Sequence, residues 1–296
     1  MNIERIREEY QIIHPQYQPD FDPLMPGVEY DAVVTHAHFT KDVTSRLSTM
    51  VHAAVEAGID TIWTSGHDTP REYDLVSQVV SDRGYHLEVK PAIEISARGP
   101  HDQLRHVIAY GVEDAPPPGL TPEGVNEWAH KQGPHVKTGL AHPELLYFSV
   151  RRHELAANQE LPSEQRYDIG EIANGGVVSI NAWREKHPVL AKVLAAKMPS
   201  EKANETMSEI VLAQFELPAL GGDDFHHPSE VGNVVNLVPR TMDIFDAAKS
   251  GQLLIAVRRE PIVPATWRFG VGTFRGAMKD RQIMRQWPKA PARAAA

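Results

Sequence analysis

Short apolar segments that predict β-strands alternate with amphipathic segments that predict α-helices along most of the chain. The predicted strands cover residues 30–35, 59–64, 87–95, 106–110, 137–141, 168–172, 176–181, 217–222 and 253–257. The predicted helices cover residues 42–58, 70–83, 122–131, 144–157, 182–197, 201–215 and 241–250, and three of them stop at Gly58, Gly84 and Gly251. This alternation is typical of an α/β protein whose parallel sheet is either open or closed into a barrel.

Polar side chains stand at the ends of these predicted strands. The first strand ends in V-V-T-H-A-H, and His36 and His38 share one face because side chains alternate along a strand. The other polar residues at strand ends are His67, Glu94, His142, Asp224 and His226, while His106 begins its strand instead of ending it. In parallel α/β sheets the carboxyl ends of the strands share one face, so we expect these side chains to lie together.

The residue types at these strand ends suit a divalent metal. Imidazole nitrogen is a common metal ligand, and two rings on one rigid edge lose little freedom when they close on an ion. The chain has no Cys, so a metal would be held by His, Asp and Glu. Because the chain has 15 His in 296 residues, an H-x-H pair alone can also arise by chance.

Composition argues against several classes of protein. The formal net charge of −9 argues against broad binding to the backbone of duplex nucleic acid, whereas a small or single-stranded phosphate substrate held by metals stays compatible. No apolar run reaches the length of about 18 residues that a membrane span needs. The charged start M-N-I-E-R-I-R-E-E-Y lacks the apolar core of a secretory signal, so we expect a cytoplasmic protein without a membrane partner.

The alternating pattern divides the chain into three parts. Residues 31–257 carry it and are predicted to form one domain, with a hydrophobic content of the whole chain, 42%, that allows a substantial core. Residues 1–30 are charged and then rich in Pro and Asp, and predict an N-terminal arm. Residues 258–296 end in A-P-A-R-A-A-A and predict a loosely ordered C-terminal tail. Whether the arm or the tail caps a pocket or joins subunits into a homo-oligomer stays open.

Six ordered blocks of the sequence resemble the motifs of one superfamily. They are H-A-H from His36, G-I-D-T-I-W-T-S-G-H-D-T from Gly58, P-A-I-E-I-S-A-R from Pro91, R-H-V-I-A-Y-G from Arg105, A-H-P from Ala141 and G-D-D-F-H from Gly222. On these blocks the chain resembles the PHP (polymerase and histidinol phosphatase) superfamily of metal-dependent phosphoesterases over residues 31–257. The resemblance implies a distorted (β/α)₇ barrel.

The resemblance also implies two or three divalent ions (Mn, Fe or Zn) at the strand ends. The metal ligands that it implies are His36, His38, Asp42, His67, Glu94, His106, His142, Asp224 and His226. Glu94 is the type of carboxylate that can bridge two cations. A hydrogen-bonded polar cluster without metal is the alternative for the whole set, and a core His that faces the sheet is the alternative for His106.

The sequence departs from the superfamily pattern at two positions. Gly66 stands where the family's T-D-H motif has an Asp, which removes one carboxylate. Asp42 comes one residue earlier than the Asp of H-x-H-S-x-x-S-D, which puts its role and a full three-metal site in doubt. A further family block, I-E-V-x-N, matches either G-E-I-A-N, with Glu171 and Asn174, or V-S-I-N, with Asn181.

The activity that the resemblance implies is hydrolysis of a phosphate ester of a small molecule or nucleotide by a metal-activated water. Arg98 resembles an Arg of some members, and its planar guanidinium suits a phosphate oxygen, although a solvated surface Arg is the alternative. Arg98 and the rim imidazole of His226 are the predicted catalytic residues. Two other functions stay open, an amidohydrolase-like metal hydrolase of C–N or C–O bonds and a non-catalytic regulatory PHP module.

Overall fold

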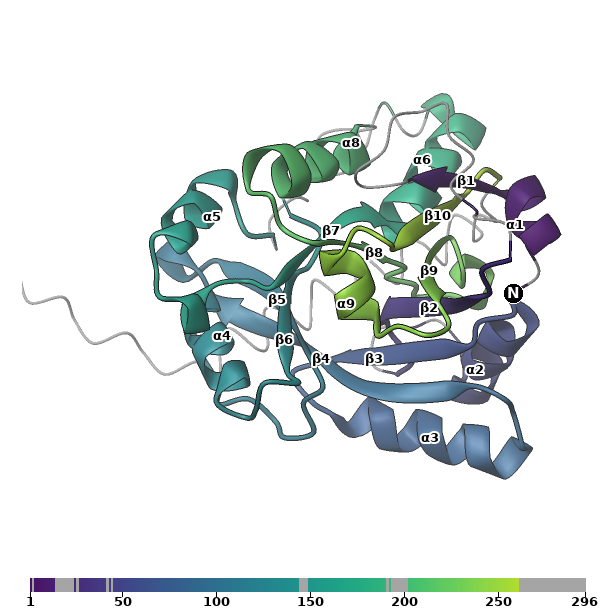
Figure 1. Ribbon diagram of the computed structural model, residues 1–296, viewed down its shortest axis with the longest axis horizontal. Helices are drawn as coiled ribbons and strands as arrows, with labels where there is room; N and C mark the ends of the chain where they lie inside the picture. The colour runs from purple at the N-terminus through teal and green to yellow at the C-terminus, as the bar shows by residue number, and fades with distance from the viewer. Residues whose placement is uncertain are drawn as a thin grey trace, which may run out of the picture.

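A single mixed sheet organises the protein. The computed structural model describes residues 1, 3–13, 24, 27–40, 43, 45–143, 149–189, 192 and 202–260. Within these residues, ten strands form one sheet in the order β1-β10-β9-β2-β3-β4-β5-β6-β7-β8. The strands are β1 (Tyr10–Ile13), β2 (Tyr30–Ala37), β3 (Thr61–His67), β4 (Glu88–Arg98), β5 (Leu104–Tyr110), β6 (Lys137–Leu140), β7 (Ile169–Asn174), β8 (Ala219–Gly222), β9 (Val234–Pro239) and β10 (Leu254–Arg258). The sheet curls through the centre of the molecule (Figure 1).

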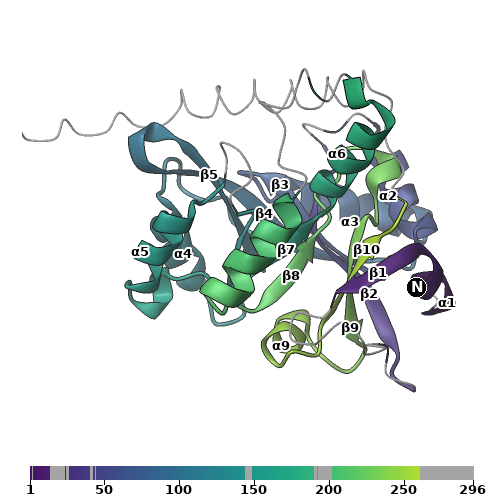
Figure 2. The same ribbon diagram turned by 90° about the horizontal axis from the view of Figure 1, so that it is seen from above.

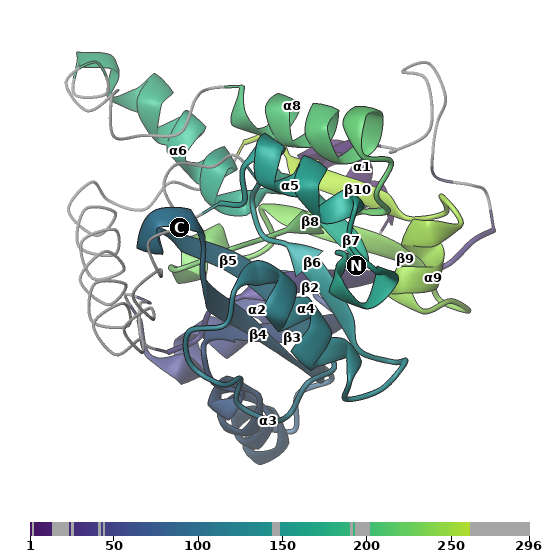
Figure 3. The same ribbon diagram turned by 90° about the vertical axis from the view of Figure 1, so that its left-hand side faces the viewer.

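Helices surround the curled sheet. They are α1 (Ile3–Glu9), α2 (Leu47–Glu56), α3 (Arg71–Arg83), α4 (Pro122–His130), α5 (Arg152–Gln159), α6 (Gly175–Lys186), α8 (Ala203–Ser208) and α9 (Ile244–Lys249), with short helical turns at Pro100–Asp102, Ser163–Gln165, Glu209–Gln214 and Pro228–Glu230. The helices α4 and α5 lie together at the opposite end of the molecule from α1 (Figure 2), and α3 and α8 lie on opposite sides of the sheet (Figure 3). None of the helices among the described residues has the length and apolar character needed to cross a membrane.

The directions of the strands explain why the start of one strand lies at the same edge of the sheet as the ends of others. The sheet is parallel through β2-β3-β4 and through β6-β7-β8, but β5 runs antiparallel to both of its neighbours. The prediction of a purely parallel sheet is therefore wrong. Because β5 runs the other way, its start lies beside the end of β4, and His106 pairs with Ser96. A residue that begins β5 thus reaches the same rim as residues that end the parallel strands.

The curl of the sheet brings β8 next to β2. A parallel bridge joins Ala37 to Phe225, directly beyond the two strand ends. Lower in the sheet, the Asn236 side chain of β9 pairs with the backbone of β8: its Nδ2 donates to Gly221 C=O at 2.8 Å, and its Oδ1 accepts from Gly221 N–H at 2.8 Å. The same Nδ2 lies 3.2 Å from Val33 C=O of β2. The side-chain amide of Asn236 therefore connects β9 to both β8 and β2 by hydrogen bonds.

Two predicted segments differ from the structure, and one strand was not predicted. Residues 176–181, predicted as a strand from their β-branched residues, belong to α6, because the Asn174 side chain accepts the Val177 N–H at 3.2 Å and begins a helix there. The strand β9 was not predicted. The segment predicted as an arm contains β1, which pairs with β10, whereas residues 14–23 and 261–296 lie outside the described residues. The predicted domain boundaries stay predictions.

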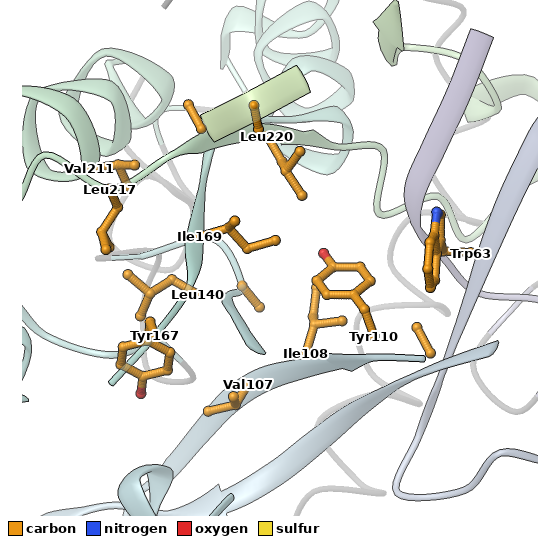
Figure 4. Packing of buried hydrophobic residues seen from close by; sticks show 14 of the residues in the cluster. Trp63, Val107, Ile108, Tyr110, Leu140, Tyr167, Ile169, Val211, Leu217 and Leu220 are labelled. Carbon is orange, nitrogen blue, oxygen red and sulfur yellow. The ribbon is translucent and has the colours of Figure 1, made fainter. Parts of the chain in front are cut away.

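Two large apolar clusters hold the sheet against its helices. One packs the β4 to β8 half of the sheet against α4, and Figure 4 shows Ile108, Tyr110, Leu140 and Ile169 within it. The Trp63 ring meets Tyr110 edge-on, with ring centroids 5.5 Å apart. The other cluster packs β2, β9 and β10 against α2 and α3. Both halves of the rim therefore stand on a packed core, which limits how far the polar side chains at the strand ends can move.

Candidate metal centre

Two imidazoles leave the end of β2 together. Relative to β3, β2 has one extra residue between Val34 and Ala37, which is a β-bulge. The Ser65 hydroxyl satisfies the backbone there, because it accepts the Ala37 N–H at 2.7 Å and donates to the Ala37 C=O at 3.1 Å. Around this irregularity, His36 Nε2 and His38 Nε2 lie 3.0 Å apart, and both rings are buried. The two predicted ligands of the H-x-H motif thus converge.

The Glu94 carboxylate lies in the middle of five imidazoles. It is 1% exposed, and its two oxygens face different rings. The distances from Oε1 are 2.7 Å to His106 Nδ1, 3.2 Å to His142 Nε2 and 3.6 Å to His36 Nε2. The distances from Oε2 are 3.2 Å to His67 Nδ1 and 3.4 Å to His38 Nε2. One carboxylate from β4 therefore joins donors from the ends of β2, β3, β5 and β6.

The residues that follow β8 add a second carboxylate and a more exposed imidazole. Asp224 Oδ1 lies 3.4 Å from His38 Nε2 and 3.6 Å from His36 Nε2. Asn174 Nδ2 donates to Asp224 Oδ2 at 3.1 Å and fixes the carboxylate from the other side. The His226 ring stacks on His38 at a centroid distance of 4.6 Å, and its side chain is 34% exposed. His226 stands where the cluster opens to solvent.

Hydrogen bonds on the outer side of two imidazoles decide which nitrogen faces the cluster. His36 Nδ1 donates to Glu171 Oε1 at 2.8 Å. The Ser149 hydroxyl donates to the His142 C=O at 2.6 Å, so it accepts from His142 Nδ1 at 3.2 Å. With the hydrogen on Nδ1, the neutral ring directs the lone pair of Nε2 inward, toward the position that a cation would occupy. The donor set therefore fits a metal better than a purely hydrogen-bonded cluster.

Glu171 orients two imidazoles at once, a role that the sequence left open. It is 2% exposed on β7, and while Oε1 accepts from His36, Oε2 accepts the backbone N–H of His142 at 2.8 Å. Asn174, three residues later, donates to Glu171 Oε2 at 3.3 Å. Of the two candidate blocks, G-E-I-A-N reaches the centre, whereas Asn181 lies on α6. The sequence feature that could have pointed to Glu171 is its position at the end of a predicted strand, residues 168–172.

Backbone strain gathers at the same rim. Asp68, His142 and Asp224 have φ values of 54°, 31° and 48°, although none of them is glycine. They follow β3, β6 and β8, next to or within the set of predicted ligands. Such conformations cost on the order of 1 kcal/mol or more each and persist where surrounding contacts hold them, which is common at functional sites.

Burial and mutual attraction oppose each other in the cluster. Burial disfavours a charged His36, but the carboxylates of Asp224 and Glu171 raise its pKa well above the ordinary value. Burial also disfavours an ionised Glu94, but the imidazoles around it, His106 first, hold its pKa well below the ordinary value. The same balance, with His36 as the main partner, lowers the pKa of Asp224. The ionised carboxylates need positive charge beside them, which a divalent cation would supply.

Three groups of donor atoms among the described residues are compact enough to hold a metal ion. In each group the ligand atoms lie within 4.8 Å of one another. The groups are His36, His38 and Glu94; His67, Glu94 and His106; and His38, His67 and His226. The first two share Glu94, and the last two share His67. The residues present therefore fit a divalent cation with nitrogen and oxygen ligands.

Among the described residues, one predicted site residue, Arg98, does not join this cluster. Arg98 ends β4, and its Nε and Nη2 both lie 2.6 Å from Asp102 Oδ1, in an ion pair at the rim of the sheet. Asp42 lies outside the described residues. The structure thus brings together eight of the nine predicted metal ligands, and it places the predicted phosphate contact at the edge.

Comparisons with known proteins give weak likenesses. No protein-family model matches the chain, and no curated protein sequence matches it. Among solved structures, it is similar to a candidate metal-dependent phosphoesterase from Bifidobacterium adolescentis, at 14% identity and a TM-score of 0.44, over 66% of this chain and 87% of that chain. It is also similar to an amidohydrolase from Chromobacterium violaceum with bound sulfate and no metal, at 12% identity and a TM-score of 0.48, over 76% of this chain and 97% of that chain. Neither likeness assigns this chain to a superfamily or an activity.

Proposed function

We propose that the chain is a metal-dependent phosphoesterase that hydrolyses a phosphate ester of a small molecule or nucleotide. The observation that carries the proposal is that the two oxygens of Glu94 face different imidazoles. A carboxylate placed in this way can join two cations about 3.5–4 Å apart, as in two-metal phosphatase sites. The fold that we propose is the distorted (β/α)₇ barrel of PHP type, supported by the strands β2 to β8, which curl until the residues after β8 meet the end of β2.

The proposed centre divides its work among the residues of the rim. The residues that would hold two or three divalent ions (Mn, Fe or Zn) are His36, His38, His67, Glu94, His106, His142, Asp224 and His226, with Asp42 as a further ligand. When bound, such ions lower the pKa of a water to near neutrality and neutralise charge on the phosphate oxygens. Glu171 and Ser149 keep two of the imidazoles in the orientation and tautomer that ligands need.

The proposed catalytic residues are Arg98, at the edge of the sheet, and His226, on the open side of the cluster. Arg98 follows Glu94 by four residues on β4, so both side chains stand on the same face of the strand. Its guanidinium would exchange Asp102 for a phosphate oxygen, which it can meet with two N–H groups. His226 is solvent-accessible beside Asp224 and, when it does not bind a cation, would hold the proton that the leaving alkoxide takes up.

The expected partners follow from charge and from the buried donors. A small phosphorylated substrate is favoured over duplex nucleic acid because the chain carries a formal net charge of −9. We propose a cytoplasmic protein that acts without a membrane partner, and its association into a homo-oligomer stays open.

Aryl phosphates, lactones and amides, each assayed with Mn, Fe and Zn in turn, test the proposal. Hydrolysis of the phosphate ester is the expected result. Turnover of lactones or amides alone would indicate an amidohydrolase-like enzyme, and an empty site without turnover would indicate a regulatory module. We expect His36→Ala and Asp224→Ala to abolish hydrolysis and release metal, while His153→Ala, an exposed residue of α5, serves as the control. Phosphatase activity that survives in both variants would contradict the proposed centre.

A further inference from the structure

A glycine next to a proposed ligand leaves room for a carboxylate from another element. Gly66 lies in β3 between Ser65 and His67, and α3 runs beside this strand (Figure 1). A Cβ added to Gly66 would lie 2.6 Å from Cγ, 2.7 Å from Cδ and 3.0 Å from Oε2 of Glu72. Since atoms do not approach so closely, any side chain at position 66 would displace Glu72. Position 66, within the strand β3, therefore needs a glycine because a larger side chain would overlap Glu72.

The carboxylate that fills this space holds the chain just after β2. Glu72 lies in the first turn of α3 and is 3% exposed. Its Oε2 accepts the Phe39 N–H at 3.1 Å, and its Oε1 accepts the Thr40 N–H at 2.8 Å together with the Thr40 hydroxyl. A buried carboxylate is costly unless such hydrogen bonds compensate it. These hydrogen bonds therefore join the first turn of α3 to residues 39 and 40, and we call them the clamp.

The residue before this clamp is one of three that the donor groups share, together with His67 and Glu94. His38 belongs to two of the three groups of donor atoms. Its Nε2 lies 3.4 Å from both Glu94 Oε2 and Asp224 Oδ1, and its ring stacks on His67 and His226. A small rotation of the backbone at residues 38–40 would therefore move His38, a ligand that belongs to two of the donor groups.

We propose that Glu72 is a positioning residue that fixes the His38 imidazole through the backbone of residues 39 and 40, and that Gly66 admits it. This inference rests on the proposed metal centre. Glu72 belongs to none of the three donor groups among the described residues, so it acts through the chain and not as a ligand. On the opposite side, the Phe39 ring packs edge-on against Phe225 at a centroid distance of 5.2 Å. The segment after β2 is thus held from two directions.

The test compares Glu72→Gln with a matched control, Asp74→Asn. Glutamine keeps the size of the side chain but turns one acceptor into an N–H group that faces the Phe39 or Thr40 N–H. Asp74 lies in the same helical turn and is exposed, so its variant reproduces any effect on the helix N-terminus alone. We expect Glu72→Gln to weaken Co²⁺ binding, followed by absorption, by about 10–100-fold, and Asp74→Asn to leave it unchanged.

A second pair of variants tests whether positions 66 and 72 act together. Gly66→Ala should weaken Co²⁺ binding to a similar degree because its Cβ displaces Glu72, while Gly124→Ala, whose Cβ would meet its neighbours at 3.5 Å or more, should not. Adding Glu72→Ala to Gly66→Ala should cause little further loss, since the clamp is already open. Additive losses would overturn the inference, and so would a Glu72→Gln variant that binds Co²⁺ like the wild type. If Glu72→Gln does not fold, the Gly66 cycle decides.

Metal-free protein separates this inference from the proposed function. In the presence of EDTA, imidazole NMR signals of His38 should shift in Glu72→Gln, whereas those of His142, on the other side of Glu94, should stay. If the wild type binds no divalent ion, the metal centre is wrong and the NMR signals still test the clamp. If the wild type binds Co²⁺ while neither binding nor the His38 signals respond to Glu72→Gln, the clamp is wrong and the centre stands.

Discussion

The buried carboxylates of the rim act on several partners each, which makes single residues decisive. Glu94 lies between five imidazoles, and Glu171 joins the ring of His36 to the backbone of His142. Glu171 is buried and contacts the outer nitrogen of the His36 ring. Glu171 therefore contributes by orienting the His36 and His142 imidazoles toward the proposed metal site. A substitution of Glu171 should change the affinity for the metal.

We predict that Glu171→Gln lowers the affinity for Mn²⁺ by about 10–100-fold. An amide cannot accept at both ends, so it loses either the His36 Nδ1–H or the His142 N–H. Calorimetric titration of the metal-free protein measures the effect, with Glu164→Gln, an exposed residue of the same chain segment, as the control. Equal affinity in both variants would show that Glu171 does not orient the ligands.

Most of the ligand residues were predictable because they stand at the end of an apolar segment, while His106, which begins its strand, followed from the resemblance to the superfamily motifs. The residues behind them were not. Ser149 and Glu171 act through contacts with residues 7 and 135 positions away in the chain, and even the place of Glu171 at the end of a predicted strand does not show which residues it contacts. Glu72 was hidden in the same way, because its role depends on the space that Gly66 leaves.

At the scale of elements, an ionisable side chain ties α4 to the opposite, amino-terminal ends of β6 and β7. His130 Nε2 lies 2.8 Å from Asp168 Oδ2, and His130 Nδ1 lies 2.7 Å from the Glu164 C=O. The Asp168 hydrogen bond, opposed by partial burial, raises the pKa of His130. Asp168 also accepts the Thr138 N–H at 2.8 Å, so the same carboxylate secures the start of β6.

This contact predicts a pH-dependent stability. The raised pKa means that the folded state favours protonated His130, so the stabilisation is complete below the ordinary pKa near 6.5 and is lost as pH rises through the raised value. We expect His130→Ala to lower the free energy of unfolding by about 1 kcal/mol more at roughly pH 5.5 than at roughly pH 9. Urea unfolding at both pH values measures it, with His153→Ala as the control. A loss that is equal at both pH values would contradict the assignment.

The seam between β9 and β8 gives a second prediction for an element. Asn236→Leu would leave the Gly221 N–H buried without its partner, while the Gly221 C=O would keep only the Thr35 hydroxyl as a donor. We expect the free energy of unfolding to fall by about 1–3 kcal/mol, measured by urea unfolding, because an unsatisfied buried group costs about this much. The exposed substitution Glu164→Gln serves as the control. A decrease in the free energy of unfolding below about 0.5 kcal/mol would show that the Asn236 amide does not stabilise the contact between the strands.

The type and place of most elements followed from periodicity and glycines, and Gly58, Gly84 and Gly251 do adopt positive φ. The direction of β5 did not follow, since an antiparallel strand has the same local pattern as a parallel one. The helix α6 was missed because β-branched Val177 and Val178 favour a strand locally, while the Asn174 cap and tertiary packing favour a helix.

At the scale of the whole molecule, the proposed ligands come from the ends of β2, β3, β4, β5, β6 and β8. Metal would therefore join most of the curled sheet at one rim. The return of the residues after β8 to β2 did not follow from the alternating pattern, which fits an open sheet and a barrel equally, and only the superfamily resemblance implied a barrel. The closure depends on Asn236 and on the bridge at Ala37 and Phe225.

Removal of metal should destabilise the protein as a unit. At a free ion concentration of about 100 times Kd, binding stabilises the folded state by about 2.7 kcal/mol, so chelation should lower Tm by several degrees. Differential scanning calorimetry with EDTA and after addition of Mn²⁺ measures the change. In His36→Ala the shift should be much smaller, and an unchanged Tm in the wild type would indicate that no ion is bound in the folded state.

Anomalous diffraction from crystals grown with Mn²⁺ tests the central claim most directly, because it locates each ion. The account predicts at least two anomalous peaks at the rim, on either side of the Glu94 carboxylate, with His36 and His38 around one peak and His67 and His106 around the other. Crystals of Glu94→Gln should lose at least one of these peaks. A wild-type map without a peak beside Glu94, at Mn²⁺ concentrations that load ordinary metalloenzymes, would contradict the account.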